Sequence, residues 1–193
     1  MSTFAKNCSP AFLLVLFAAC GNESLGDLTG SSVALREDGA GVGPNIVVEF
    51  VGTAQGEFRD VDGIEMDCFD VDIVDPATGR VIGNGSDCLD LGSIGGGDPT
   101  IEGFAINNTQ FFHLNGGFVK SLLRTTIQPV LDGSSVGNTH ITGDVPGGEI
   151  LEGTGRFSRL EGGVARLSGA VDMSRFFSEN IITFNCIFVL TID

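Results

Sequence analysis

Hydrophobic and polar residues alternate with a period of two along much of the chain beyond residue 45. Phe69, Val71 and Ile73 alternate with Asp70 and Asp72. Near the C-terminus one face is wholly apolar, at Ile182, Phe184, Cys186, Phe188, Leu190 and Ile192. This period is typical of β-strands that bury one face. We therefore expect Asp70 and Asp72 to point to solvent and the thiol of Cys186 to be buried.

Turn-forming residues separate the alternating stretches. The candidate turns are Asn107-Asn108, Asn115-Gly116-Gly117, Asp132-Gly133, Pro146-Gly147-Gly148 and Glu161-Gly162-Gly163. Asn-Gly between alternating segments is a strong hairpin signal, because type I′ turns need positive φ at both central residues. We expect a meander of strands at 101–106, 109–115 and 118–128, and no helix beyond a turn at 174–178. The pattern predicts about eight to ten strands arranged as a sandwich or a closed antiparallel barrel.

Residues 149–171 distinguish the barrel from the sandwich. They contain a Gly-Thr-Gly-Arg-Phe turn at 153–157, a short stretch ending at Gly163, and a strand rich in small residues at 164–169. This segment resembles the last third of the allene oxide cyclase and dirigent-protein families. A second similarity to the dirigent proteins is the Ala-Gln-Gly turn within residues 51–58.

The resemblance implies an all-β domain, an antiparallel eight-stranded barrel of the allene oxide cyclase or dirigent type. Members of those families bind a small, largely apolar molecule inside the barrel. Some steer its cyclisation without a cofactor, and many are trimers, so a homo-oligomer is expected here too. None of the families' catalytic residues can be matched to this sequence by motif.

The amino-acid composition argues against some classes of binding partner. The chain of 193 residues has 10 Lys+Arg against 25 Asp+Glu, a formal charge of −15. Nucleic acid is a polyanion that needs a basic face, so it is not expected as a partner. The chain also has 15 Phe but no Trp or Tyr. That favours an apolar interior, and it argues against stacking of sugars on aromatic faces.

The N-terminus has the pattern of an export signal. Residues 11–17 form an unbroken apolar run, preceded by Lys6 and followed by Ala18-Ala19-Cys20-Gly21. This arrangement resembles a bacterial lipoprotein signal peptide, in which a peptidase cuts before the cysteine and the thiol is acylated. The apolar run is too short to span a bilayer, which needs about 20 residues.

The lipoprotein resemblance implies three parts: a signal peptide at 1–19, a lipidated flexible tether at 20–43 that begins with Cys20, and a β-barrel domain at 44–193. It places the protein in the bacterial cell envelope, held on the membrane by lipid and facing the periplasm or the cell surface. The alternative is secretion without a lipid anchor.

Two cysteines flank a strong turn. Cys68 and Cys88 lie almost symmetrically about the Asp-Pro-Ala-Thr-Gly sequence at 75–79. Opposed positions on two antiparallel strands favour a cross-strand disulfide, which would contribute about 3 kcal/mol in the chain-entropy model. Metal ligation is the alternative, although two thiols without a nearby third ligand make a poor zinc site.

His113 and Glu149 are the candidates for catalysis. His113 follows Phe111 on one face of its strand, so it could lie inside the barrel as a general base or on its rim. Glu149 lies beside the Gly-Thr-Gly turn, where desolvation would raise the pKa of an inward carboxyl. Solvent exposure is the alternative for Glu149 and for its neighbour Glu152, and His140 is equally ambiguous.

A group of acidic residues surrounds the first cysteine: Asp60, Asp62, Glu65, Asp67, Asp70, Asp72 and Asp75. Asp60 and Asp62, next to Gly63, supply the hard oxygen ligands of a calcium loop, but the spacing of an EF-hand is absent. A solvated charged face is the favoured interpretation. A calcium site at Asp60 and Asp62 is the alternative, and no other metal site is expected.

No cofactor is expected. The sequence has no phosphate loop, and residues 153–155 should lead into a strand rather than the helix of a dinucleotide site. Two functions remain. One is a non-catalytic module that binds a small apolar ligand or a partner. The other is a cofactor-free isomerase or cyclase, which would be favoured by an inward-facing ionisable group.

Overall fold

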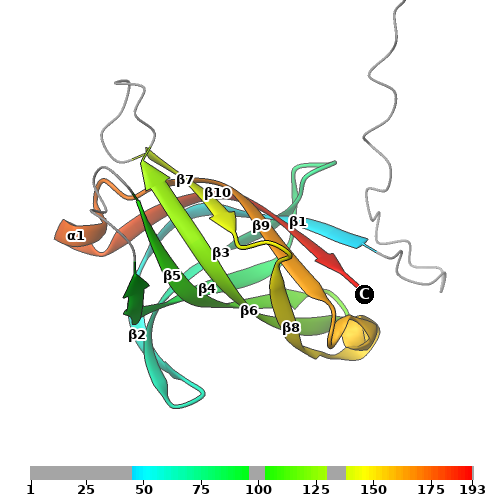
Figure 1. The fold of residues 1–193 in the computed structure, drawn as a ribbon. Coiled ribbons are helices and arrows are strands. Elements are labelled where there is room, and N and C mark those ends of the chain that lie inside the picture. Colours follow the sequence, from blue (N-terminus) through cyan, green and yellow to red (C-terminus); the bar gives the residue numbers. More distant parts are fainter. Residues whose placement is uncertain (1–44, 96–102, 130–137, 193) are drawn as a thin grey trace, which may run out of the picture. The chain divides into compact units, whose positions relative to one another are not determined.

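A computed structural model gives the fold of residues 45–95, 103–129 and 138–192 (Figure 1). Within these residues one sheet of ten strands is accompanied by a 3₁₀ helix, η1, and an α-helical turn, α1. The elements are β1 Asn45–Gln55, β2 Glu57–Val61, β3 Ile64–Asp75, β4 Arg80–Gly95, β5 Phe104–Leu114, β6 Gly117–Pro129, β7 Asn138–Gly143, β8 Gly148–Gly153, η1 Gly155–Leu160, β9 Val164–Asp172, α1 Phe176–Glu179 and β10 Ile181–Thr191. No helix among them is long and apolar enough to cross a membrane.

The sheet is antiparallel and closes on itself. Hydrogen-bonded neighbours follow the order β1-β10-β9-β7-β6-β5-β4-β3, and β1 also pairs with β3. At the closure Phe50 of β1 lies opposite Cys186 of β10 on one side and Ile73 of β3 on the other. The structure is therefore a closed barrel and not a sandwich (Figure 1).

Ten strands make eight positions in the wall because two positions are shared. β7 and β8 both lie between β6 and β9. β1 and β2 follow each other along β3 and are separated at Gly56. A Cβ atom at Gly56 would lie 2.3 Å from Asp67 Oδ1, so a larger residue there would have to displace that side chain. The predicted eight-stranded antiparallel barrel is thus confirmed.

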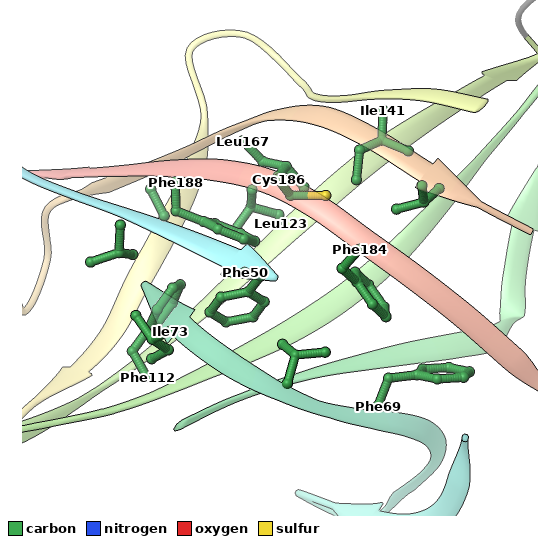
Figure 2. Packing of buried hydrophobic residues seen from close by; sticks show 14 of the residues in the cluster. Phe50, Phe69, Ile73, Phe112, Leu123, Ile141, Leu167, Phe184, Cys186 and Phe188 are labelled. Atoms are coloured by element: carbon green, nitrogen blue, oxygen red, sulfur yellow. The ribbon is translucent and has the colours of Figure 1, made fainter. Parts of the chain in front are cut away.

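The alternating apolar residues fill the barrel. The ring centroid of Phe50 lies 5.1 Å from that of Phe112 and 4.5 Å from that of Phe188. Figure 2 shows these rings among aliphatic side chains between the strands. Gly85 of β4 makes room for Phe50, because an added Cβ would lie 2.4 Å from its ring. This part of the interior is therefore packed without space for a ligand.

The residues of β3 that point into the barrel are the ones that the sequence predicted. Phe69, Val71 and Ile73 are buried in the core, while Asp70 and Asp72 are exposed. Asp70 accepts hydrogen bonds from both terminal nitrogens of Arg59 on β2, and this guanidinium lowers the pKa of Asp70. Such an exposed pair contributes little to stability.

The 3₁₀ helix η1 closes the barrel at the end opposite α1 (Figure 1). It buries Phe157 and Leu160, which are three residues apart and therefore share one face of a 3₁₀ helix. Gly117 of β6 approaches so closely that an added Cβ would lie 2.2 Å from the carbonyl oxygen of Thr154. The prediction of a strand directly after the Gly-Thr-Gly turn was wrong. The segment forms a 3₁₀ helix instead, because this conformation buries both Phe157 and Leu160 against the core.

The disulfide between Cys68 and Cys88 is confirmed. The two residues lie opposite each other on β3 and β4, with their Cα atoms 3.9 Å apart. The bridge is buried in a small cluster with Val61 and Met66, against which Phe111 packs. This cluster is separate from the main core of the barrel.

One predicted turn is wrong. Asn107 and Asn108 lie in the middle of the continuous strand β5, not between two strands. Asn107 accepts a hydrogen bond from Arg124 at 3.0 Å, and Asn108 bonds to side chains on both neighbouring strands. Because their amides have these partners, they do not need the backbone contacts that favour a turn.

The other turn predictions fare better. Residues 115–116 form a turn between β5 and β6, residues 161–162 form a turn between η1 and β9, and residues 144–147 lie between β7 and β8. The predicted helical turn near residue 176 is α1. Residues 132–133 lie outside the described part of the chain.

Candidate functional site

Five polar side chains lie inside the barrel, on positions where the alternation would usually place apolar residues. They come from three adjacent strands: Asp87 on β4, Asn108 and Gln110 on β5, and Ser121 and Thr125 on β6. The register places Asp87 opposite Gln110, and Gln110 opposite Ser121. We refer to these five residues as the polar arc.

Asp87 is the centre of a hydrogen-bonded chain. Asn108 Nδ2 and Gln110 Nε2 each donate to Asp87 Oδ1 over 3.0 Å. Thr125 donates to the amide oxygen of Asn108 at 2.7 Å, and Ser121 donates to that of Gln110 at 2.9 Å. The two hydroxyls thereby hold both amides with their N–H groups toward the carboxylate. Within the described part of the chain no residue donates to Asp87 Oδ2, so among these residues this carboxylate oxygen has no hydrogen-bond partner.

Burial controls the acid–base behaviour of Asp87. The residue is 4% exposed, and desolvation raises the pKa of its carboxyl to about 6. The hydrogen bonds from Asn108 and Gln110 lower the pKa in part, and no cation of the described residues contributes. Asp87 therefore changes its charge between mildly acidic and neutral pH, which is the range that suits a general acid or base.

A small cavity borders the polar arc. Its volume is about 20 Å³, which is room for one water molecule. Asp87, Asn108 and Thr125 line one side, and aliphatic and aromatic side chains line the rest. Met173 and Ile182, which flank α1 in the chain, are part of this lining, so the cavity lies at the α1 end of the barrel.

Two other titratable groups are buried in the described part of the chain. Cys186 lies on the inner face of β10, as predicted; burial and, secondarily, the charge of Asp87 raise the pKa of its thiol to about 12. The thiol therefore stays neutral and is a poor nucleophile. Asp67 on β3 accepts a hydrogen bond from Asn180 Nδ2 at 3.0 Å, and burial raises the pKa of its carboxyl.

Asp67 corrects the prediction of a wholly solvated acidic face. The alternation on β3 places it on the same side as Phe69, which faces the core. It is 1% exposed, and Asn180 at the end of α1 supplies its partner. The other acidic residues of that group are exposed or half-buried.

The two catalytic candidates lie on the outside of the barrel. His113 is exposed on β5 between the inward-facing Phe112 and Leu114, with its ring centroid 5.0 Å from that of Phe118. Of the two alternatives for His113, the interior is excluded and the outer surface is observed, because the inner positions of this part of β5 belong to Phe112 and Leu114. Glu149 on β8 is exposed as well. Glu152 and His140 are also exposed.

Asp60 and Asp62, in the hairpin that joins β2 and β3, already have partners. Asp60 Oδ1 accepts a hydrogen bond from the backbone N–H of Gly63 at 3.0 Å. Asp62, at φ 55°, forms an ion pair with Lys120 of β6. The described residues bring no three His, Cys, Asp or Glu side chains together in a way that could hold a metal ion. The calcium alternative stays an untested prediction.

Sequence reasoning missed the polar arc because it did not consider Asp87 and because it assigned Asn108 to a turn. A signal was nevertheless present in the sequence. If Cys88 points outward into a disulfide, strand alternation requires Asp87 and Leu89 to point inward. Likewise, counting back by twos from Phe112 puts Gln110 and Asn108 on the buried face.

The signal peptide, the tether and the lipidation site at Cys20 fall on residues 1–43, outside the described residues. The predicted division into signal peptide, tether and a domain that starts at residue 44 is not tested, because the described residues begin at Asn45. Export and anchoring therefore stay predictions.

Comparison with known proteins adds little to this picture. No family model matches the chain, and no curated protein matches its sequence. Among solved structures it is similar to one described as a nonspecific heme-binding cyclase that catalyses a (4 + 2) cycloaddition during neoabyssomicin biosynthesis. The identity is 15%, the TM-score is 0.36, and the match covers 78% of this chain and 66% of the other, just under two thirds. A likeness this weak carries no argument about the fold or the function of this chain.

Proposed function

We propose that the barrel binds a small, largely apolar molecule at the α1 end of its interior and anchors it by one hydrogen bond to Asp87. The observation that carries this proposal is a buried carboxylate beside a cavity, one oxygen of which receives no hydrogen bond from the described residues. Buried polar groups in proteins are nearly always satisfied, by the protein, by water or by a ligand. Apolar walls with a few fixed polar groups are typical of ligand sites.

The cavity must widen to admit more than a water molecule. Met173 is the side chain best suited to move, because it is unbranched, lies on the lining and can adopt many shapes. The Phe50, Phe112 and Phe188 cluster lies outside the lining and is tightly packed. Widening is therefore expected at the α1 end alone.

Native mass spectrometry of the protein purified from its own membrane tests the proposal. The wild type is expected to carry a co-purified small molecule, and Asp87→Leu is expected to lose it. Asp72→Asn is the matched control, because Asp72 is exposed on the outer face of β3. A ligand that is retained equally by all three proteins contradicts the proposed anchor, and a wild type without any ligand contradicts binding. The same spectra count the subunits, which tests the trimer that the family resemblance implies.

A cofactor-free isomerase or cyclase is the second candidate. Asp87 favours it, because an inward carboxyl that titrates near pH 6 can give a proton to an apolar substrate or accept one from it. Isomerisation and cyclisation conserve mass, so the test is chromatography of the ligand before and after incubation with the protein. A product of equal mass that Asp87→Asn fails to form supports catalysis. An unchanged ligand leaves the binding function and removes the enzymatic one.

We also propose export and a lipid anchor at Cys20. The Cys68–Cys88 disulfide supports the first part, since such bonds persist in oxidising compartments. Labelling with fatty acid tests the second part. The wild type should be labelled and stay with the membrane, whereas Cys20→Ala should be unlabelled and released. Membrane attachment that is the same in both proteins would exclude the anchor.

A further inference from the structure

We propose that the protonation state of Asp87 decides which ligands the cavity accepts: hydrogen-bond donors when the side chain is a carboxylate, and hydrogen-bond acceptors when it is a carboxylic acid. This inference rests on the proposed binding function and specifies the chemistry of the same site. It predicts two ligand classes for one pocket, selected by pH.

The hydrogen bonds of the polar arc make the two oxygens of the Asp87 carboxyl group different from each other. Oδ1 accepts N–H groups from both Asn108 and Gln110. Ser121 and Thr125 hold these amides in place by donating to their oxygens, so the amides cannot turn over without breaking those bonds. A proton added to Asp87 would meet the amide hydrogens at Oδ1, and it therefore belongs on Oδ2. The group that faces a ligand is then O⁻ in one state and O–H in the other.

The described groups around Asp87 are neutral, so none of them fixes its protonation state. β5 and β6 face it with neutral amides and hydroxyls, and β3 faces it with Phe69, its partner across the strand pair. β10 contributes Cys186, whose thiol stays neutral because its pKa is about 12. Asp67 is the other buried carboxyl of the described residues, and it is bound to Asn180 on the side of α1. No lysine, arginine or histidine is among the buried residues described, so no cation holds Asp87 in the charged state.

Small rings of similar size test the proposal on the full chain. Pyrrole can only donate through its N–H, cyclopentanone can only accept, and cyclopentane can do neither. Binding is measured by NMR at pH 5 and pH 7.5, from the side-chain amide signals of Asn108 and Gln110. We expect pyrrole to bind about tenfold more tightly at pH 7.5 and cyclopentanone about tenfold more tightly at pH 5, since a mismatch leaves a buried polar group unpaired.

Two variants separate Asp87 from other groups. Asp87→Asn keeps an oxygen for both amides and presents a permanent N–H to the cavity, so it should prefer cyclopentanone at both pH values. Asp67→Asn should keep the switch of the wild type. If Asp67→Asn loses the switch while Asp87→Asn retains it, the assignment to Asp87 is wrong.

The outcomes also separate this inference from the function on which it rests. Rings that bind with no change of preference between the two pH values overturn the switch and leave ligand binding intact. If no ring binds at either pH, the proposed binding function itself is overturned. Cyclopentane that binds as tightly as the polar rings shows that Asp87 takes no part in recognition.

Discussion

Replacing Asp87 by Asn should make the protein more stable at neutral pH and should remove part of its pH dependence. The carboxyl of Asp87 is buried and accepts two amide hydrogen bonds through Oδ1. An asparagine side chain can keep both bonds through its own Oδ1 and place its amide nitrogen where Oδ2 faces the cavity. The substitution therefore removes a buried charge with little change of shape.

The magnitude follows from the shift of the pKa. Burial raises the pKa of Asp87 from 3.8 to about 6 in the folded protein. Each unit corresponds to about 1.4 kcal/mol, so the shift is worth about 3 kcal/mol in the free energy of unfolding. Because the folded state binds the proton more tightly, this contribution is complete below pH 4 and is lost as the pH rises through about 6. Asp87→Asn has no carboxyl at this position, so its free energy of unfolding does not fall with pH for this reason.

Urea unfolding followed by far-ultraviolet circular dichroism measures the effect, since the chain has no Trp or Tyr to serve as a fluorescent probe. The unfolding free energy of Asp87→Asn minus that of the wild type should rise by about 3 kcal/mol between pH 3 and pH 7. Contributions from Asp67 and Asp70 are common to both proteins and cancel in this difference. Asp72→Asn, at an exposed position, should show no such rise. A difference that stays constant with pH, or falls, would refute the reasoning.

Three further substitutions test the packing. Replacing Cys68 and Cys88 by Ala should lower the unfolding free energy by about 3 kcal/mol, because the bridge closes a long loop in the unfolded chain; equal urea midpoints for variant and wild type would contradict this. Gly85→Ala should cost about 1–3 kcal/mol through overlap with the ring of Phe50, and adding Phe50→Leu should recover part of the loss; a double variant that loses the sum of both effects would exclude the overlap. Phe112→Ala should cost about 3–5 kcal/mol, as calorimetry can show, because its ring contacts two others in the core; a loss below about 1 kcal/mol would mean that the core is loosely packed.

Much of the fold could be predicted from the sequence because strand alternation is a local signal. Phe69, Val71 and Ile73 on one side, with Asp70 and Asp72 on the other, define the phase of β3 without any knowledge of the rest. The near-symmetric placement of Cys68 and Cys88 about a turn then predicted the pairing of β3 with β4 to within one residue, and a register shift between Ile73 and Val74 places the two cysteines directly opposite each other. Barrel closure could not be derived in this way, because it depends on the pairing of β1 with β3 and β10. It came from the family resemblance.

The failures at polar residues share a physical cause: the side chain in question has a hydrogen-bond partner far away in the sequence. Asn107 and Asn108 suggested a turn, but Arg124 and Asp87 satisfy their amides inside a strand. Asp67 suggested a solvated acid, but Asn180 lies beside it, 113 residues later in the chain. The turn propensity of Asn and the surface preference of Asp apply to side chains that are hydrated by water. The side chains of Asn107, Asn108 and Asp67 bond to protein groups instead.

The composition could not predict the candidate site, because the side chains of the polar arc are also paired with partners that are distant in the sequence. The abundance of Phe predicted an apolar interior, and most of the interior is apolar. The polar arc exists because five polar residues on β4, β5 and β6 satisfy one another, which makes their burial tolerable. His113 and Glu149 attracted interest as single residues, whereas the functional candidate is a connected group.

The central claim is that Asp87 is a buried, titrating carboxyl with one oxygen directed at a cavity. A pH titration of its carboxyl ¹³C signal by NMR, in the full chain, tests this most directly. We predict a midpoint near 6, well above the usual value for aspartate, with the side-chain amide protons of Asn108 and Gln110 shifting at the same pH. A midpoint near 4, with those amide signals unmoved, would show that Asp87 is solvated and would contradict the account.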